Sequence, residues 1–350
     1  MGKTLATLVL ATSIILSCLP SVKADWNEKD GVYDVSLTPA GSLQISVEQP
    51  NFHTLREAVD FIPPKGYETE TVRINAYDGT YSVDEEEPSF TLKNKQLIGK
   101  TNPNPEVSLK TGYVIEEPSA GAVIDRTTIV MGDDSILENM ILNPNKDADR
   151  FYLIINNGVG FGTEGLTKNV IINNNYFEYG NNLPQISLRG SDVDNVEVTN
   201  NIFAGGEGIG FSRLYVAGGE PPIQTGEVKL KGNTFYGLKT GFTARGIGGV
   251  NLGSLEEAGE NIFIKNEFNG EVYDTPSKVP AIYNYWYGTE TDITLKTTEE
   301  DILKTIKIVE PTVSSIESQT LVQTLIDVLP CYITDPLNPM CYVDTWGLYD

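Results

Sequence analysis

Three of the seven arginines in this 350-residue chain, Arg189, Arg213 and Arg245, follow asparagines of a repeated pattern by 14, 12 and 12 positions. Near-equal offsets would place them on one face of a repeat protein. A guanidinium group binds a carboxylate through two parallel hydrogen bonds, so such a face could be a groove for an anionic sugar chain. Asp192 and Asp194 lie close to Arg189 and are assigned to the same substrate-binding surface. The alternative is an Arg–carboxylate ladder with no ligand, because surface ion pairs need no function.

A second group of polar residues could bind a cation. Residues 143–149 place oxygen-bearing side chains at alternating positions, including Asp147 and Asp149, and this arrangement suits a hard cation such as Ca²⁺. The segment lacks the glycine and the bidentate glutamate of an EF-hand loop. It could equally be a polar turn. Ca²⁺ is the one cofactor that the sequence suggests.

Other chemistries find little support. The only histidine, His53, precedes a predicted helix and lies outside the repeats. This argues against Ser-His-Asp hydrolysis and against metal sites built from several histidines. The formal net charge of −23 argues against nucleic acid and against anionic membranes as partners.

The repeated pattern itself predicts the fold. It reads apolar, any residue, apolar, a polar corner with Asn, and Phe two residues after that Asn, at residues 170–177, 196–203, 228–235 and 262–268. The corner residues are Asn175, Asn201, Asn233 and Asn266, separated by 26, 32 and 33 residues. Self-similarity at such periods is typical of repeat architectures.

Each copy is typical of a strand followed by a tight turn, because apolar residues alternate and Asn favours corners. No helical pattern separates the copies. We therefore expect an all-β parallel β-helix, a single-stranded solenoid with an Asn ladder at one corner and a Phe stack inside. A β-propeller is the runner-up, but its hairpin turns would have to recur at a fixed place in each repeat, and they do not.

The two ends of the chain differ from the repeats. Residues 1–24 are expected to be a signal peptide, residues 25–297 the β-helix, and residues 298–350 a helical cap and tail. The pair Thr54 and Glu57 forms a predicted capping box that opens a short helix near 54–62, before Pro63. Helical spacing returns after residue 298, so a cap is expected at each end.

The signal peptide makes this an exported protein. Its apolar run, residues 5–16, is too short to span a bilayer, so no transmembrane helix is expected in the mature chain. Loss of Lys3 and Lys23 with the signal would change the net charge from −23 to −25. Residues 15–18 resemble a bacterial lipobox, so a lipid anchor at Cys18 competes with plain cleavage. Cys331 and Cys341 then remain, as a disulfide pinning the tail or as two buried thiols.

Several segments resemble the pectate-lyase-like right-handed parallel β-helix superfamily. Residues 52–60 and 72–81 are similar to its N-terminal helix, strand and turn, and residues 284–288 are similar to an end motif of surface β-helix repeats. Residues 86–92 and 96–99 resemble a secreted bacterial subgroup of unassigned function. The resemblance spans roughly residues 50–290 and implies a right-handed coil.

The resemblance also suggests a chemistry. Uronate lyases of this superfamily use an Arg or Lys as the base, with Ca²⁺ held by Asp and Glu, which makes the central Arg213 the base candidate. The arginine and histidine signatures of the pectate lyases and polygalacturonases are absent. We expect a secreted or surface-attached protein that binds an acidic polysaccharide and could cleave it by β-elimination. The alternative is a non-catalytic structural or adhesion module of the cell envelope.

Overall fold

The structure is a computed structural model that describes most of the region between residues 25 and 309. The described residues are 25–27, 30–42, 50–83, 89–104, 117–143, 153–155, 167–178, 184–189, 193–212, 223–245, 247–254, 256–273, 279–287, 295–297 and 306–309. The predicted signal peptide, Cys18, Asp147, Asp149, Asp192, Arg213, Cys331 and Cys341 lie outside these residues.

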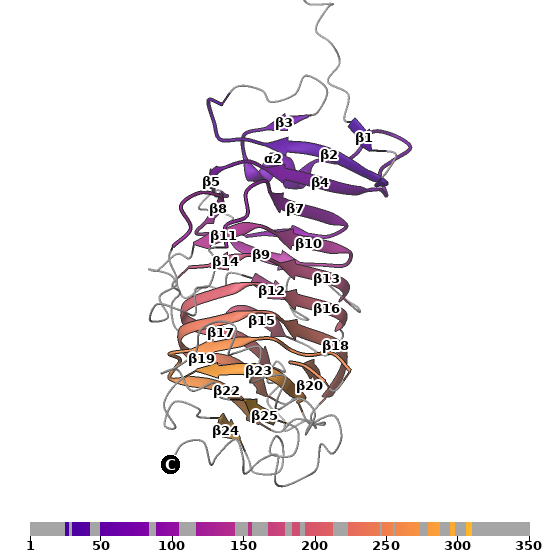
Figure 1. The fold of residues 1–350 in the computed structure, drawn as a ribbon. Coiled ribbons are helices and arrows are strands. Elements are labelled where there is room, and N and C mark those ends of the chain that lie inside the picture. The colour runs from indigo at the N-terminus through magenta and orange to yellow at the C-terminus, as the bar shows by residue number, and fades with distance from the viewer. Residues whose placement is uncertain are drawn as a thin grey trace, which may run out of the picture.

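One sheet forms the first face of the molecule, here called face A. Its parallel strands are stacked in the order β2 (Val32–Leu37), β4 (Thr71–Ala76), β7 (Lys95–Gly99), β10 (Ser135–Glu138), β13 (Thr167–Asn173), β16 (Val193–Thr199), β18 (Ile223–Lys231) and β20 (Ile247–Asn251). At the N-terminal end β1 (Asp25–Asn27) pairs antiparallel with β2, and β3 (Asn51–Phe52) pairs parallel with it. Figure 1 shows this stack running down one side of the molecule.

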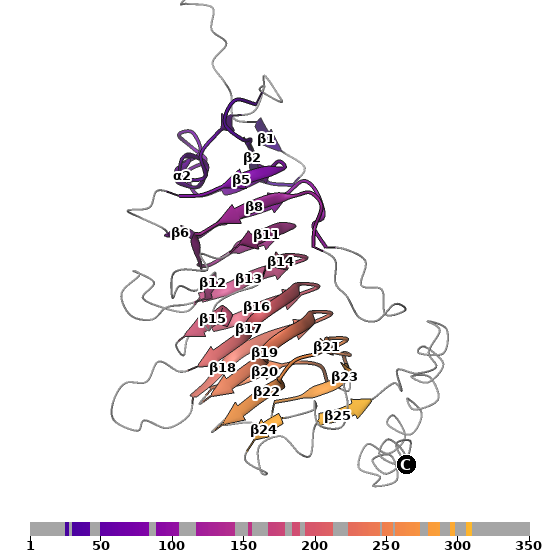
Figure 2. The ribbon, with the colours of Figure 1, turned by 90° about the vertical axis from the view of Figure 1, so that its left-hand side faces the viewer.

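The second sheet has two branches, which form faces B and C. Face B consists of β5 (Gly79–Tyr81), β8 (Ala122–Asp125), β11 (Met140–Asn143), β14 (Tyr176–Phe177), β17 (Ile202–Ser212), β19 (Thr234–Arg245), β21 (Ile262–Ile264), β23 (Ala281–Tyr287) and β25 (Ile306–Val309). Face C consists of β6 (Ser89–Leu92), β9 (Thr128–Met131), β12 (Leu153–Ile155), β15 (Pro184–Arg189), the second halves of β17 and β19, β22 (Phe268–Tyr273) and β24 (Leu295–Thr297). Figure 2 shows these strands stacked along the same axis.

From β4 to β22 the chain visits the faces in the order A, B, C, and each circuit adds one strand to each stack. The circuit from β13 through β14 and β15 to β16 is one example. Residues in the left-handed region mark the corner between A and B, including Asn174 and Asn200, with φ of 55° and 56°. In β17 the bend from B to C falls at Gly205 and Gly206, whose φ values of 69° and 81° favour glycine.

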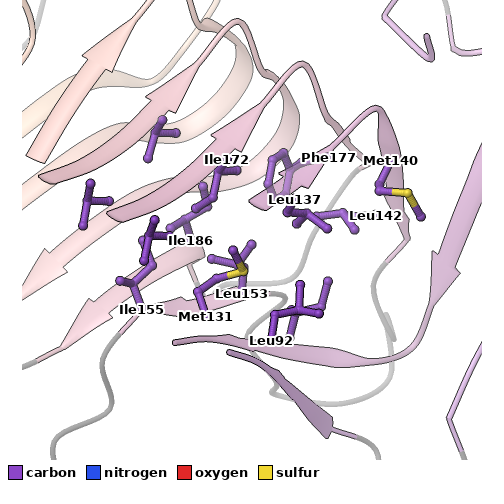
Figure 3. Close-up of a cluster of buried hydrophobic side chains, with 14 of the residues drawn as sticks. Leu92, Met131, Leu137, Met140, Leu142, Leu153, Ile155, Ile172, Phe177 and Ile186 are labelled. Carbon is purple, nitrogen blue, oxygen red and sulfur yellow. The ribbon is translucent and has the colours of Figure 1, made fainter. Parts of the chain in front are cut away.

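One hydrophobic core runs through the interior and receives side chains from all three faces. In Figure 3, face A contributes Leu137 and Ile172, face B contributes Leu142 and Phe177, and face C contributes Met131, Leu153 and Ile186. A column of phenylalanines lies within this core. The rings of Phe177, Phe203, Phe235 and Phe263 are stacked with centroids 4.6, 5.1 and 4.6 Å apart. By curling around this core, the parallel strands bury their apolar sides without covering helices.

A single short helix, α2 (Leu55–Asp60), is found among the described residues. The hydroxyl of Thr54 accepts a hydrogen bond from the backbone N of Glu57 at 3.3 Å, as a capping box requires on its N-cap side. Leu55, Ala58 and Val59 are buried in the core. The helix is shorter than the predicted 54–62, because Phe61 already has an extended ψ of 131°.

The prediction of an all-β chain with stacked parallel strands is confirmed, and the arrangement is consistent with a parallel β-solenoid. The right-handed twist of the coil and the helical caps stay predictions.

Candidate functional site

A row of buried asparagines follows the corner between faces A and B. The side-chain amide of Asn175 donates to Oδ1 of Asn201 at 3.0 Å, and that of Asn201 donates to Oδ1 of Asn233 at 3.1 Å. The row continues through Asn261 to Asn284, with distances of 2.9 and 2.8 Å. From Asn201 onward each Oδ1 also accepts the backbone N of the preceding member, for example Asn175 N to Asn201 at 2.9 Å. The row therefore ties successive coils together.

The fourth predicted member of this row, Asn266, is not part of it. The row uses Asn261, and Phe263 rather than Phe268 joins the phenylalanine column. Asn266 is buried elsewhere, where its Oδ1 accepts the backbone N of Leu238 at 2.9 Å. The pattern misled because residues 262–264 form strand β21 on face B. The face A strand of this coil is β20, and residues 252–260 form a long connection between β20 and Asn261.

The same corner separates two roles that the sequence assigned to one residue. The left-handed conformation belongs to the residue before each of the first four ladder asparagines: Asn174, Asn200, Gly232 and Glu260, with φ between 55° and 66°. The ladder asparagines supply the buried hydrogen bonds. A glutamate can therefore occupy the strained position, although such a conformation costs a residue with a Cβ about 1–2 kcal/mol.

The predicted arginine row is present only in part. Arg189 ends β15, and its register partner on β17 is Ser212, which is in turn the partner of Arg245 on β19. The row continues to Tyr273 on β22. Arg189 and Arg245 thus share one row at the corner between faces C and A, two rungs or roughly 10 Å apart. The central place predicted for Arg213 belongs to Ser212.

A β-bulge explains this correction. Between β17 and β19 the pairing shifts from Gly206 opposite Leu238 to Glu207 opposite Thr240, so β19 holds one extra residue, Lys239. An equal offset of 12 from Asn201 and Asn233 therefore does not give equal positions in the row. A bulge inserts one residue into one strand without breaking the ladder on either side, and the repeated pattern does not encode it.

Asp194 lies on face A rather than in the arginine row. It is exposed, its register partner on β13 is Lys168, and its Oδ1 accepts the backbone N of Asn195 at 3.0 Å. On its other side Gly226 packs so closely that an added Cβ would lie 2.2 Å from Asp194 Oδ1. Arg245 is exposed and has an interaction partner of its own.

The outer surface of face B has an apolar patch that the sequence did not predict. Ile141, Tyr176 and Ile202 are neighbours in the outward-facing row, yet each is at most 4% exposed. Gly121, directly before β8, lies close to them, because an added Cβ there would come 2.9 Å from Ile141 Cδ1. Burial, together with the nearby carboxylates of Glu117 and Glu178, raises the pKa of Tyr176 to about 12.

A polar network near the N-terminal end of face A was also missed. Arg73 on β4 forms a bidentate pair with Asp34 on β2, with Nε to Oδ1 at 2.7 Å and a second nitrogen to Oδ2 at 2.8 Å. This pairing raises the pKa of Arg73. Asn75 donates to Asp34 Oδ1 at 2.9 Å and accepts from Lys100 Nζ at 2.9 Å. Asp34 and Asn75 are 7% and 6% exposed.

A loop is fastened to the outer surface of face A at the other end of the described region. Glu257 pairs with Lys229 at 2.6 Å and with Lys231 at 3.1 Å, both from β18. The hydrogen bond from Lys229 lowers the pKa of Glu257, and the same contact raises the pKa of Lys229.

Two further tests concern metals and membranes. Within the described residues, no group of three or more His, Cys, Asp or Glu side chains is placed to hold a metal ion. In the same part of the chain no helix is long and apolar enough to cross a bilayer.

Comparisons with models of known protein families, with curated proteins and with solved structures found no match to this chain.

Proposed function

We propose that this chain is an exported β-solenoid that binds an acidic polysaccharide along the corner between faces C and A. The observation that carries the proposal is the register of Arg189, Ser212 and Arg245 in one row at the ends of successive face C strands. A row of cationic and hydroxyl groups repeating along an axis suits a polymer whose carboxylates repeat along its own axis.

The electrostatics favour a specific site. The chain carries a formal net charge of −23, so its field repels acidic polymers elsewhere on the surface and local cations must supply the attraction. A guanidinium group has five donors and can bind a carboxylate through two of them. Ser212 adds a hydroxyl that can donate to or accept from a sugar.

The proposal consists of binding, with cleavage by β-elimination as a possible second step. Elimination of a uronate needs a base beside the reacting carbon, and the base candidate Arg213 is one residue beyond the row. The proposed solenoid is right-handed, because crossovers between parallel strands almost always have that hand. It also has helical caps at its ends, with α2 at the N-terminal end. Export rests on the predicted signal peptide.

A binding assay tests the proposal. Uronate polymers, with neutral glucans as controls, are titrated against the protein with and without Ca²⁺. The double variant Arg189→Gln/Arg245→Gln should bind acidic polymers at least roughly tenfold more weakly, the loss expected for two exposed ion pairs. The matched control Lys168→Gln/Lys231→Gln removes the same charge from face A and should bind normally. Equal losses in both variants, or no binding to any acidic polymer, would contradict a specific site.

The same assay addresses cleavage. An unsaturated uronate product absorbs in the ultraviolet, so absorbance is followed after each addition of polymer. A rise that Arg213→Gln abolishes would support elimination with Arg213 as the base. Binding without any rise would limit the function to recognition.

A second candidate is a non-catalytic structural or adhesion module, and a specific observation favours it. Polar side chains at equivalent positions of neighbouring coils bond to one another, as Asn173 does with Glu138 at 2.8 Å and Thr199 does with Asn173 at 2.9 Å. Axial bonding of this kind stiffens a rod. A protein that binds no glycan but adheres to intact cells through these faces would fit this candidate.

A further inference from the structure

The polar network at the N-terminal end of face A brings an amine, a side-chain amide and a carboxylate together. Lys100 Nζ lies 2.9 Å from Asn75 Oδ1, and Asn75 Nδ2 lies 2.9 Å from Asp34 Oδ1. We propose that Lys100 and Asn75 form an intramolecular isopeptide bond, with Asp34 as the group that transfers the proton. The modification would join two neighbouring coils covalently.

The backbone holds the two reacting residues on adjacent rungs. Ala76 is the register partner of Gly99, and the backbone N of Lys100 donates to the carbonyl of Ala76 at 2.8 Å. Because Nζ already contacts Oδ1, it lies within roughly 3–4 Å of the carbon that bears that oxygen, near the separation from which attack proceeds. Bond formation therefore requires a small movement of the lysine side chain and none of the backbone.

The surroundings of Asn75 favour attack over simple solvation. Its side chain is 6% exposed, and its amide nitrogen contacts the buried carboxylate of Asp34 and the carbonyl of Val35, at 2.9 and 3.4 Å. Arg73 fixes both oxygens of that carboxylate, so Asp34 cannot swing away from the amide. The nitrogen that must leave is thus the one in contact with a proton-transfer group.

The step balances without an oxidant or a cofactor. Lys100 reacts as the neutral amine, and a bond forms between Nζ and Cγ of Asn75 while the bond between Cγ and Nδ2 breaks. The lysine ammonium gives up two protons in all. The Asp34 carboxylate takes up one of them and passes it to Nδ2, the other reaches the leaving nitrogen through solvent, and that nitrogen departs as ammonium. The net change is the loss of one ammonia from the mass of the protein.

Other lysines in the described region have different partners. Lys95 donates to the backbone carbonyl of Phe61 at 2.7 Å, and Lys231 pairs with the carboxylate of Glu257 at 3.1 Å. The acceptor is a backbone carbonyl in the first case and a carboxylate in the second. Neither is a side-chain amide that could release ammonia. The combination of amine, buried amide and buried carboxylate is what distinguishes the site at Lys100.

Mass spectrometry of the intact full-length protein tests the proposal. The wild-type protein should be lighter than its Lys100→Arg variant by one ammonia more than the Lys-to-Arg change explains. Arg retains the positive charge but does not form this bond. Peptide mapping of the wild type should find a branched peptide joining Lys100 to Asn75. A wild-type protein that keeps its full sequence mass after prolonged incubation, with separate peptides for both residues, overturns the proposal.

Two controls make the result specific. Cyclisation at Asn-Gly sequences, here 157–158 and 269–270, also releases ammonia, but it yields a linear peptide and persists in the Lys100→Arg variant. The Asp34→Asn variant tests proton transfer and should contain a much smaller cross-linked fraction than the wild type. If Asp34→Asn were to cross-link fully, the assigned role of Asp34 would be wrong. If it does not fold, the Lys100→Arg mass comparison and the peptide map still decide the bond.

Discussion

The buried asparagine row and the row of Arg189, Ser212 and Arg245 run along the same axis, but they keep register differently. From Asn175 to Asn284 the asparagines form four consecutive amide links of 2.8–3.1 Å, although the sequence separation varies between 23 and 32 residues. The arginine row spans Arg189 and Arg245 with Ser212 between them, after a bulge has shifted one strand against the next.

The difference shows where a solenoid tolerates variation in coil length. A misplaced asparagine inside the coil would leave amide groups buried without partners, at a cost of about 1–3 kcal/mol each. A misplaced residue at the outer corner stays in water and costs little. Coils of different length are therefore aligned at the inner corner, and extra residues collect at the bulge and in the loops.

We expect the largest loss of stability from a substitution in the buried asparagine row. Asn201→Ala removes the acceptor of the backbone N and side-chain amide of Asn175, and it removes the donor to the carbonyl of Ile172. Several buried groups lose partners together, so we expect the free energy of unfolding to fall by about 3 kcal/mol or more. Equilibrium denaturation in urea measures the change.

A matched substitution on the outer surface provides the control. Asn173→Ala removes side-chain bonds to Glu138 and Thr199 on face A, where water can replace them. We expect a change below about 1 kcal/mol. Equal losses for Asn201→Ala and Asn173→Ala would show that burial does not distinguish the two rows.

Tyr176 tests whether an outward position can behave like an interior one. Its pKa rises from 10.0 to about 12 because it is buried on the outer surface of face B and lies near Glu117 and Glu178. Between these values the unfolded chain releases the phenol proton while the folded protein keeps it. Stability is therefore fully present below pH 10 and falls as the pH rises toward 12, by at most ~2.7 kcal/mol.

The measurement compares denaturation of the wild type and of Tyr176→Phe across this alkaline range. Other tyrosines titrate in both proteins, so the difference between them isolates Tyr176. The wild type should lose more stability than the variant from pH 10 to 12. Parallel curves would mean that the side chain is solvated in solution.

The sequence sufficed for the fold because the fold is periodic. Alternating apolar residues with a corner asparagine predicted stacked parallel strands, and Asn175, Asn201 and Asn233 lie in one row as the pattern requires. The prediction for Asn266 was wrong because the long connection at residues 252–260 moved the last copy of the pattern to another face. Asn261 and Phe263 have the same spacing as Asn175 and Phe177, and the ring stacking and backbone pairing show that Phe263 continues the column.

The candidate sites depended on details that no repeat encodes. Arg213 was assigned the central place because counting from the asparagines ignores the extra residue Lys239 in β19. The network of Asp34, Asn75 and Lys100 joins residues 25 and 41 positions apart in coils that precede the recognisable repeats. No spacing rule could have selected it. The network is identified by the contacts among its polar side chains, and only the three-dimensional structure shows these contacts.

An added arginine in the row of Arg189 and Arg245 should strengthen the binding of an acidic polymer. Ser212→Arg would place guanidinium groups on three consecutive rungs, between Arg189 and Arg245. We expect about fivefold tighter binding of an acidic polymer, the equivalent of ~1 kcal/mol for one exposed ion pair. Stability should fall slightly through repulsion. Titration with a uronate polymer measures the affinity, and weaker binding by Ser212→Arg would place the ligand elsewhere.

The smallest expected effect concerns the loop fastened to face A by exposed charges. Glu257→Gln removes the ion pairs with Lys229 and Lys231 but keeps the size of the side chain. Because the pKa of Glu257 is lowered in the folded protein, its contribution is present above the ordinary carboxylate pKa and is lost as the pH falls. Salt screens exposed charges, so the variant should unfold at a slightly lower temperature in dilute buffer and match the wild type in 1 M salt. A difference that survives high salt would mean that this loop is held by more than charge, and that register outside the core is enforced more strongly than the arginine row suggests.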